Sequence, residues 1–410
     1  MRDNHFSFER MIHPVGEDTF LREYWEQKPL LIARGKPDYY CDVLSMADID
    51  SIVGFRQLEY SQLKIARAEQ AQPAKVFYVD SDSTSDTNRL FHSYGQGDTV
   101  ALNFAQCYWE PAARLCSEFE NFFHFPAGAN AYLTPRHSQG FPAHFDSHDV
   151  FVIQVEGAKN WRIYSSQEQL PCGMEDGKPI PLELLGAPLR ELRLTAGDLL
   201  YIPRGCVHEA RTTDASSLHV TVGVRSYKWK DLLGELLMAA SQENLELRKA
   251  LPVGFMNSQK AVEMMVDRLP QLISTLADSG RIESSIGRLR ERLIERKRPL
   301  PDAHFRSLDK VDQIDLDTMV AKREGMMCHV SRKADCVEIA FPGNRMKGPV
   351  DIETAFRFIA DSKQAFPVRA LPDILSEKSK LVLARRSIRE GLLSILRLKA
   401  AHPTAGQLGS

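Results

Sequence analysis

The sequence predicts an α+β fold with a β-rich first half, a helical middle segment and a mixed C-terminal region. Three observations support this prediction. Short β-type runs separated by turn residues extend to about residue 229, and apolar residues at helical spacing follow to about residue 298. Strand-like and helix-like patterns then alternate through the rest of the chain. With 410 residues, 43% of them hydrophobic, the chain can bury substantial cores in two or three domains.

The first half contains short runs of β-branched and aromatic residues. Turn residues separate these runs at short intervals, which is typical of an antiparallel barrel or sandwich. The expected strands are 76–79, 131–134, 150–155, 161–164, 199–202 and 218–224. We expect a turn at Gly157 and Ala158, between the third and fourth of these runs.

The middle segment, 230–298, predicts three helices. The first two each have an apolar stripe at helical spacing. In the first helix the stripe consists of Leu232, Leu233, Leu236, Leu237 and Ala240. In the second it consists of Ala261, Val262, Met265, Leu269, Leu272, Ile273 and Leu276. The third runs from Ile282 to Arg298 and is followed by Pro299 and Pro301. Its arginines alternate with glutamates, which favours an ordinary surface helix over a nucleic-acid contact.

The last hundred residues predict a smaller mixed domain. We expect a strand at 337–341, followed by a turn at Gly343 and Asn344. We expect helices at 352–359 and 379–396. A short polar tail ends the chain. The second of these helices is basic, so it could contact rRNA, although a solvated helix face is the interpretation that we favour.

Composition says more about the cellular compartment of the protein than about its binding partner. The basic and acidic residues nearly balance, at 52 and 54, so net charge names no partner. The first residues are charged where a signal peptide needs an apolar stretch, and no apolar run reaches the length of a membrane span. The odd number of cysteines and the lack of a CxxC pair favour reduced thiols, and we expect a cytoplasmic protein. The cysteines are Cys41, Cys107, Cys116, Cys172, Cys206, Cys328 and Cys336.

Two motifs predict a metal site. The first, from Gly140 to Asp146, contains His144 and Asp146, which a strand would project from one face. The second runs from Gly197 to His208, and its turn residues return a histidine toward the same interior. Two imidazoles and one carboxylate form the facial triad of non-haem Fe(II) oxygenases.

Neighbouring residues offer alternatives to these ligands. His148 has the same parity as His144 and could line the pocket or replace a ligand, and Asp149 follows it directly. His137 and His219 are further candidates. We interpret the three histidines as polar lining or strand surface, because a single histidine near a motif is more often structural than a ligand.

The chain resembles the ribosomal oxygenases, which are JmjC-type cupin enzymes that hydroxylate residues of ribosomal proteins. The resemblance is carried by the stretches 20–32, 130–135, 138–146 and 150–164. It extends along nearly the whole chain and is sharpest between 128 and 223.

The resemblance implies a domain order. Residues 1–229 would form a double-stranded β-helix, the JmjC or cupin barrel. Residues 230–298 would form a helical dimerisation domain, 299–400 a winged-helix-like domain and 401–410 a tail. A homodimer follows from this order.

The resemblance also implies roles for individual residues. His144, Asp146 and His208 would hold Fe(II), which the cosubstrate 2-oxoglutarate would chelate. Lys159, fifteen residues after His144, would bind the far carboxylate of 2-oxoglutarate, with Arg162 as the alternative. The same pocket would be lined by Asn130, Tyr132 and Thr221. Gly223 departs from the family, since some relatives have a small hydroxyl residue there.

We therefore expect a 2-oxoglutarate-dependent dioxygenase that uses O2 to hydroxylate an arginyl or histidyl residue of a ribosomal protein, releasing succinate and CO2. One alternative is the same chemistry on a peptide natural product or a free amino acid. Another is a non-enzymatic RNA-binding or scaffold protein, against which the intact triad argues. Demethylation of methyl-lysine is chemically reachable and ranks lower.

Overall fold

The chain forms two compact units, Met1–Ser226 and Tyr227–Ser410. The computed structural model describes residues 6–56, 58–59, 61–68, 75–78, 84–166, 168–172 and 178–397. The expected tail at 401–410 and Val79 of the first expected strand lie outside these residues.

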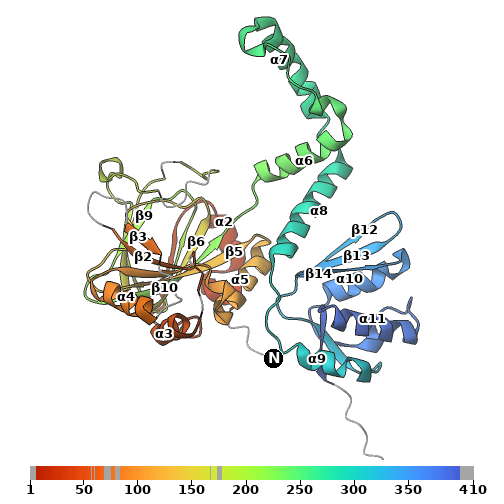
Figure 1. Cartoon of the computed structure of the whole chain (residues 1–410), viewed down its shortest axis with the longest axis horizontal. Helices are drawn as coiled ribbons and strands as arrows, with labels where there is room; N and C mark the ends of the chain where they lie inside the picture. The colour runs from red at the N-terminus through yellow and green to blue at the C-terminus, as the bar shows by residue number, and fades with distance from the viewer. Residues whose placement is uncertain are drawn as a thin grey trace, which may run out of the picture. The chain divides into compact units, whose positions relative to one another are not determined.

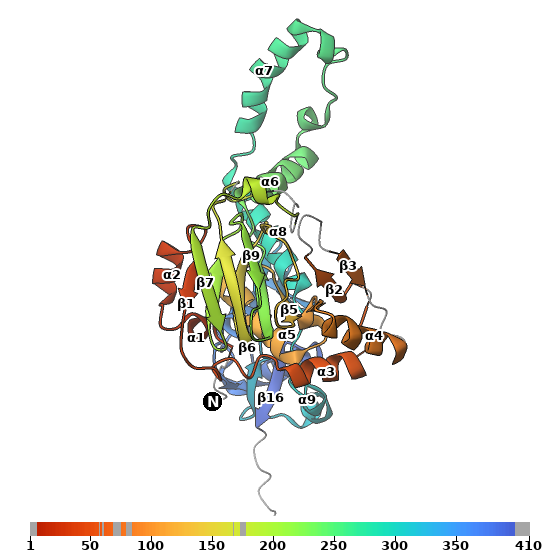
Figure 2. The same ribbon diagram turned by 90° about the vertical axis from the view of Figure 1, so that its left-hand side faces the viewer.

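A ten-stranded antiparallel sheet system organises the first unit (Figure 1). Its main path runs in the order β1 (Leu30–Ile32), β8 (Leu199–Ile202), β6 (Asp149–Ile163), β10 (Ser217–Val224), β5 (Ala127–Thr134), β4 (Thr99–Leu102), β2 (Leu63–Arg67) and β3 (Lys75–Tyr78). Two further strands, β7 (Arg190–Thr195) and β9 (His208–Arg211), flank the second half of β6 (Figure 2). Each expected strand coincides with part of one of these elements, although 161–164 extends one residue beyond the end of β6 and Val79 lies outside the described residues; β1, β2, β4, β7 and β9 were not predicted.

The expected turn at Gly157 is wrong, because β6 continues through it as one strand of 15 residues. Gly157 has a φ of +67°, and a Cβ there would lie 1.9 Å from the carbonyl oxygen of Ser216. The register with β10 shifts between Leu218 and His219, which identifies a β-bulge. The bulge lets the first half of β6 pair with β8 and β10 and the second half with β7 and β9.

An aromatic core holds the first half of β6 in place. Phe151 packs against Phe119 and Tyr201, each with ring centroids 4.9 Å apart. Phe8 and Phe20, from the N-terminal helices, complete this cluster. Each such ring contributes roughly 1.5–3 kcal/mol by burial, so the strand that leads out of the HxD motif is firmly anchored. The helices of this unit are α1 (Phe8–Ile12), α2 (Glu17–Glu23), α3 (Met46–Phe55), α4 (Thr84–Gly95) and α5 (Glu110–Phe123).

The second unit begins with the three expected helices, α6 (Trp229–Glu243), α7 (Gln259–Ser274) and α8 (Ser279–Arg296). Helix α6 contacts α8, and Glu235 of α6 pairs with Arg288 of α8 at 3.2 Å. Most of the apolar stripe of α7 stays on the surface of the single chain, with Leu269 57% and Ile273 55% exposed.

The remainder of the second unit combines two three-stranded antiparallel sheets with short helices. One sheet has the order β15 (Phe366–Pro367), β11 (Met319–Lys322), β16 (Leu393–Arg397), and the other has the order β12 (His329–Arg332), β13 (Val337–Phe341), β14 (Asn344–Gly348). The helices are α9 (Phe305–Lys310), α10 (Glu353–Asp361) and α11 (Glu377–Arg389). The expected strand 337–341 and the turn after it are confirmed as the β13–β14 hairpin.

The expected helix 379–396 is wrong in its last turns. Helix α11 ends at Arg389, and Gly391 follows with a φ of +86°, a conformation that stops a helix. Residues from Leu393 onward pair with β11 instead. The arginines of α11 make contacts within the domain: Arg385 donates to the carbonyl oxygen of Ile314 at 3.2 Å, and Arg389 pairs with Asp312. These contacts favour the interpretation of α11 as an ordinary surface helix.

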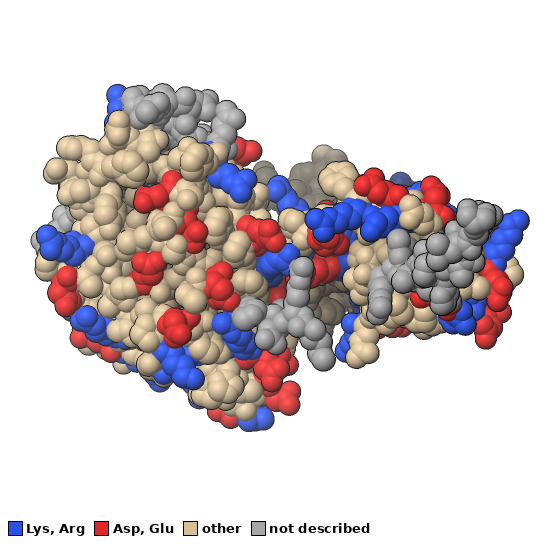
Figure 3. Space-filling view, turned by 90° about the horizontal axis from the view of Figure 1, so that it is seen from below, with Lys and Arg blue, Asp and Glu red and all other residues tan. Residues whose placement is uncertain are grey.

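Surface charge agrees with the balanced composition. Figure 3 shows basic and acidic side chains interspersed on the face that it presents. Within the described part of the chain, no helix combines the length and the apolar character that crossing a membrane requires.

Candidate metal centre

The structure brings His144, Asp146 and His208 together, although not as two residues of one strand. His144 and Asp146 lie in an irregular segment that precedes β6, and His208 is the first residue of β9. The amide of His208 donates to the carbonyl oxygen of His144 at 2.8 Å, and the amide of His144 donates back at 3.1 Å. This isolated bridge, rather than strand alternation, sets the two histidines side by side.

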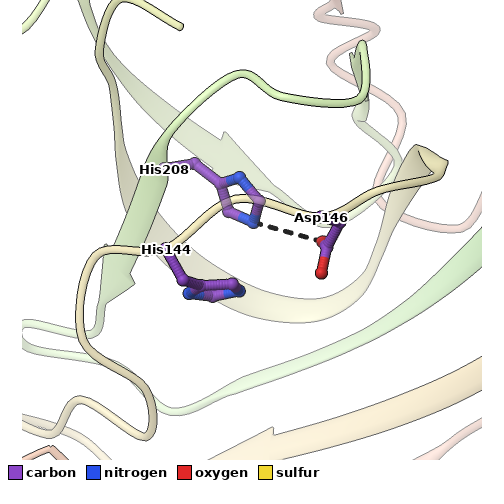
Figure 4. A group of neighbouring side chains, drawn as sticks. All are labelled: His144, Asp146 and His208. Atoms are coloured by element: carbon purple, nitrogen blue, oxygen red, sulfur yellow. Dashed lines mark ion pairs between the residues drawn. The ribbon is translucent and has the colours of Figure 1, made fainter. Parts of the chain in front are cut away.

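The three side chains converge on one point (Figure 4). One ligand atom from each lies within 4.8 Å of the other two. The His208 Nε2 is 3.7 Å from the Asp146 Oδ2, and the two imidazole centroids are 4.6 Å apart. Two nitrogens and one carboxylate oxygen on a single side of a point leave the other side open for further ligands.

Backbone carbonyls fix the tautomer of both histidines. The Nδ1 of His144 lies 2.8 Å from the carbonyl oxygen of Pro142, and the Nδ1 of His208 lies 3.0 Å from that of Cys206. Because a carbonyl oxygen only accepts, each Nδ1 carries the proton and each Nε2 keeps its lone pair. Burial, reinforced by His144, lowers the pKa of His208 to about 4, so the imidazole is neutral and able to bind a metal.

A cavity of about 690 Å³ surrounds the three side chains. Val150, Val152 and Trp161 form part of its wall, so much of the lining is apolar. Every candidate site residue from the sequence also lines it, namely His144, Asp146, His208, Lys159, Asn130, Tyr132 and Thr221. A pocket of this size accommodates a metal with a small organic acid.

Lys159 is the buried cation of this cavity. Its side chain is on β6, only 6% of the residue is exposed, and its Nζ donates to the Thr134 Oγ1 at 3.0 Å. Burial lowers its pKa to about 7. Among the described residues no carboxylate pairs with it, and a buried ammonium without a counter-ion is costly. The site therefore suits an anionic ligand.

Arg162, the alternative cation, is excluded from the cavity by its position. It pairs with Glu191 at 3.0 Å and with Glu209 at 3.8 Å, and its side chain is 49% exposed. It lines a separate surface depression rather than the cavity of Lys159. Because Lys159 and Arg162 are three residues apart on one strand, they point to opposite faces.

Asn130, Tyr132 and Thr221 lie on two paired strands of the cavity wall. Thr221 of β10 is opposite Asn130 of β5, and His219 is opposite Tyr132. The Asn130 Nδ2 donates to the Tyr132 hydroxyl at 3.3 Å, and its Oδ1 accepts from the Phe104 amide at 3.0 Å. Burial raises the pKa of Tyr132 to about 12, so its phenol remains a proton donor.

The alternative histidines have other positions. His219 is buried in the cavity, where its ring stacks on Tyr132 at 5.0 Å, and burial together with Lys159 keeps its pKa well below the usual value. His148 lines the cavity beside Gly223, where a Cβ would lie 2.5 Å from its ring. The departure at Gly223 therefore makes room for His148. His137 lies on the exposed surface between β5 and the HxD motif.

Sequence reasoning missed Glu209 and Arg225, which also line the cavity. Glu209 accepts from the Tyr164 hydroxyl at 2.7 Å and from the Gln139 Nε2 at 3.0 Å. Its position directly after His208 was the available signal, but strand alternation would have placed it on the outer face.

Comparisons with known proteins identify a domain family and several relatives of the chain. The JmjC domain family matches residues 104–232. Ribosomal oxygenase 1 of Gallus gallus is 34% identical over 312 residues, which is 68% of this chain and 49% of that protein. The bifunctional lysine-specific demethylase and histidyl-hydroxylase NO66 of Aedes aegypti is 32% identical over 302 residues, which is 70% of this chain and 47% of that protein. The chain thus spans about half the length of these curated relatives.

Solved structures share the fold. The ribosomal oxygenase YcfD of Escherichia coli aligns with a TM-score of 0.59 at 18% identity and covers 93% of this chain and 98% of its own. A second structure of YcfD, in complex with cobalt and 2-oxoglutarate, aligns with a TM-score of 0.58 at 17% identity and covers 94% of this chain and 99% of its own. These structures show the shared fold, and the JmjC domain match with the sequence relatives shows that the chain belongs to the JmjC-type ribosomal oxygenase family.

Proposed function

We propose that this protein is an Fe(II)- and 2-oxoglutarate-dependent dioxygenase that hydroxylates a side chain of a ribosomal protein. The observation that carries the proposal is the convergence of His144, Asp146 and His208 in one cavity with the buried cation Lys159. The names of the sequence relatives, ribosomal oxygenase and histidyl-hydroxylase, support the reaction class.

The donor set suits iron. His144 and His208 present Nε2 lone pairs, and Asp146 presents a carboxylate oxygen. This 2-His-1-carboxylate arrangement with open positions is the Fe(II) facial triad. When bound, Fe(II) with 2-oxoglutarate and O2 supplies the oxidising chemistry, which inserts one oxygen atom into a C–H bond and releases succinate and CO2.

Lys159 would bind the carboxylate of 2-oxoglutarate that is remote from the metal. The Thr134 hydroxyl, which accepts from the Lys159 Nζ, orients the ammonium, and the hydroxyls of Tyr132 and Thr221 lie on the same wall. A carboxylate would provide the counter-ion that the buried ammonium lacks. The YcfD complex with 2-oxoglutarate supports the choice of cosubstrate.

The charges of the cavity favour a neutral substrate side chain, so we assign a histidyl residue rather than an arginyl one. Asp146 and Glu209 are the two carboxylates among the described lining residues. The first belongs to the metal set, and both oxygens of the second already accept hydrogen bonds. Lys64 and Arg225 add positive charge to the lining. A guanidinium or a methylated ammonium would enter without a counter-ion, whereas an imidazole would not.

We also propose that the chain is a homodimer through the helical segment 230–298. Apolar side chains on this segment remain exposed in the single chain, including Met238 at 63%, Met256 at 85% and Val253 at 101%. Many exposed apolar side chains on one segment are typical of a protein–protein interface. A second copy of the same segment would cover it symmetrically. The winged-helix-like character of the domain at 299–400 remains part of this proposal.

The test is Fe(II)-dependent formation of succinate from 2-oxoglutarate, measured with and without purified ribosomal proteins, followed by mass spectrometry of those proteins. We expect succinate to rise with one ribosomal protein and a mass increase of one oxygen on a histidine. Oxidation of an arginine would replace the histidyl assignment. Turnover that ribosomal proteins do not stimulate would redirect the search to other peptides or free amino acids. Absence of iron binding would refute the oxygenase.

A further inference from the structure

A buried ionic cluster lies beside the metal centre and takes no part in the proposed chemistry. Asp149, with no exposed surface, begins β6, and Arg204, 7% exposed, lies in the turn between β8 and β9. The Arg204 Nη1 donates to the Asp149 Oδ2 at 3.0 Å, and the Arg204 amide reaches the Asp149 Oδ1 at 3.5 Å. The Tyr201 hydroxyl donates to the same Oδ1 at 2.7 Å. One arginine therefore engages both oxygens of one buried carboxylate.

Each partner is close in sequence to a different half of the proposed iron site. Asp149 follows Asp146 by three residues, and Arg204 precedes His208 by four. Next to Arg204, the amide of Gly205 donates to the carbonyl oxygen of Asp146 at 2.9 Å. The ion pair thus joins the two segments at the end opposite to the bridge between His144 and His208.

Further contacts of Arg204 anchor the pair to the surrounding unit. Its Nη1 donates to the Ser226 hydroxyl at 3.1 Å and also pairs with Glu26. The Glu26 amide in turn donates to the Tyr201 hydroxyl at 2.9 Å. Tyr201 is part of the aromatic core around Phe151, so the cluster is fixed to rigid structure.

A stability role alone accounts poorly for this arrangement. Burying two charges costs several kcal/mol for each ion, and well-packed apolar residues at such positions often serve stability equally well. The Arg204 Nε is buried without a partner among the described residues, which adds to the cost. What the pair uniquely provides is a fixed register between two segments whose side chains must meet within a few ångströms.

We propose that Arg204 and Asp149 are positioning residues that clamp together the two segments carrying the ligands of the iron site. The inference rests on the proposed function for the identity of those ligands. In the metal-free protein, the clamp holds Asp146 and His208 at the spacing that metal binding requires. Neither residue is among those that line the cavity.

The first test uses metal-free protein and asks whether the clamp orders these segments. Hydrogen exchange is measured by mass spectrometry on peptides that cover 142–148 and 203–209, in wild type and Arg204→Met. We expect exchange in these peptides to accelerate by about tenfold in the variant, while peptides from β5 and β10 keep their rates. Unchanged exchange, or equal acceleration throughout the first unit, would overturn the proposal.

The control is Arg34→Met. Arg34 is a partly buried arginine of the same unit that donates to the carbonyl oxygens of Met11 at 2.6 Å, His13 at 2.8 Å and Gly197 at 3.2 Å, none of which lies within 142–148 or 203–209. The substitution Arg34→Met removes a comparable set of hydrogen bonds and should leave hydrogen exchange at 203–209 unchanged. If Arg204→Met does not fold, the double variant Asp149→Asn/Arg204→Met leaves no uncompensated buried charge and replaces it.

The second test is titration of metal-free protein with Co(II), followed through its visible absorption. Loss of a residue that orients metal ligands typically costs roughly 10–100-fold in metal affinity, and we expect that loss in Arg204→Met and Asp149→Asn but not in Arg34→Met. Arg204→Lys should recover part of it. Equal Co(II) affinity in all variants would refute the proposed clamp. A wild-type protein that binds no metal would instead refute the proposed function, and the hydrogen-exchange experiment would still test the clamp.

Discussion

At the scale of single residues, the environment of each side chain separates a ligand from a neighbour of the same type. Asp146 and Asp149 are three positions apart, yet the first faces the two histidines and the second faces Arg204. Lys159 and Arg162 differ in the same way, since one is buried with a hydroxyl partner and the other pairs with surface glutamates. Chemistry follows from these surroundings more than from residue type.

Asp146→Ala should abolish turnover while the protein stays folded. The substitution removes one of three metal ligands and no hydrophobic packing, and the Asp146 side chain is 19% exposed. Succinate formation measures the activity, and far-UV circular dichroism measures the fold. The control is Asp214→Ala, which changes a carboxylate that is 74% exposed on the same unit and should have no effect. Turnover by Asp146→Ala at the wild-type rate would rule out the assigned ligand set.

Lys159→Ala should raise the apparent Kd for 2-oxoglutarate by at least about tenfold, because a charge-assisted contact is worth roughly 1.5–3 kcal/mol. Affinity for Fe(II) or Co(II) should change little, since Lys159 does not ligate the metal. Calorimetric titration separates the two affinities. Arg162→Ala is the matched control and should leave both unchanged, given its surface pairing with Glu191. If instead Arg162→Ala lost cosubstrate affinity, the role would move to that residue.

The same lysine predicts a pH dependence of cosubstrate binding. Burial lowers the pKa of Lys159 to about 7, so above pH 7 the amine of the free protein is increasingly neutral. A bound carboxylate favours the ammonium, and binding must then take up a proton. Affinity for 2-oxoglutarate should therefore fall as pH rises from 7 to 9, by up to about tenfold per pH unit. Titrations at several pH values measure this, and a flat profile in wild type would contradict it.

At the scale of secondary-structure elements, one long strand organises the site. The first half of β6 packs into the aromatic core, and the second half carries Lys159 into the cavity. The bulge between Gln154 and Glu156 separates the halves and changes the direction of the strand, which is a common use of bulges beside functional sites. Without the bulge, the register of β6 with β10 would be continuous and the face occupied by Lys159 would change.

Gly157→Ala should be strongly destabilising, by about 2 kcal/mol or more, because it combines a positive φ with a Cβ 1.9 Å from the Ser216 carbonyl oxygen. The matched substitution is Gly54→Ala in α3, where a Cβ meets nothing within 4 Å. That change should stabilise the protein by roughly 0.5–1 kcal/mol. Urea unfolding of both variants gives the comparison, and similar values for the two would disprove the requirement for glycine at position 157.

At the scale of the whole molecule, the helical segment 230–298 is where we propose that two copies of the chain meet. Light scattering should give twice the chain mass for the purified protein. The double variant Leu269→Asp/Ile273→Asp places charges on α7 side chains that are 57% and 55% exposed, and it should give monomers. Gln271→Asp, between them on the same helix, serves as the control. A wild-type protein of single-chain mass would refute the dimer.

Much of the architecture could be predicted from local pattern. The strand 337–341 and the helices of the segment 230–298 show strong periodicity, and the structure has them within a few residues of the expected bounds. Strand β9 has the sequence HEAR, and with a single apolar residue it shows no strand-like pattern. The helix 379–396 was extended too far because Leu392 and Leu393 fit a helical stripe as well as a strand.

The sequence by itself determined the composition of the proposed metal set, because the turn and strand residues around His144 and His208 occur at a recognisable spacing. Only the tertiary structure decided that Lys159 rather than Arg162 lies in the cavity, and that Asp149 serves Arg204. The physical reason is that local pattern reports neighbours within a few positions. Burial and ionic partners depend on where distant strands place their side chains, and the bulge in β6 and the turn around Arg204 determine those positions.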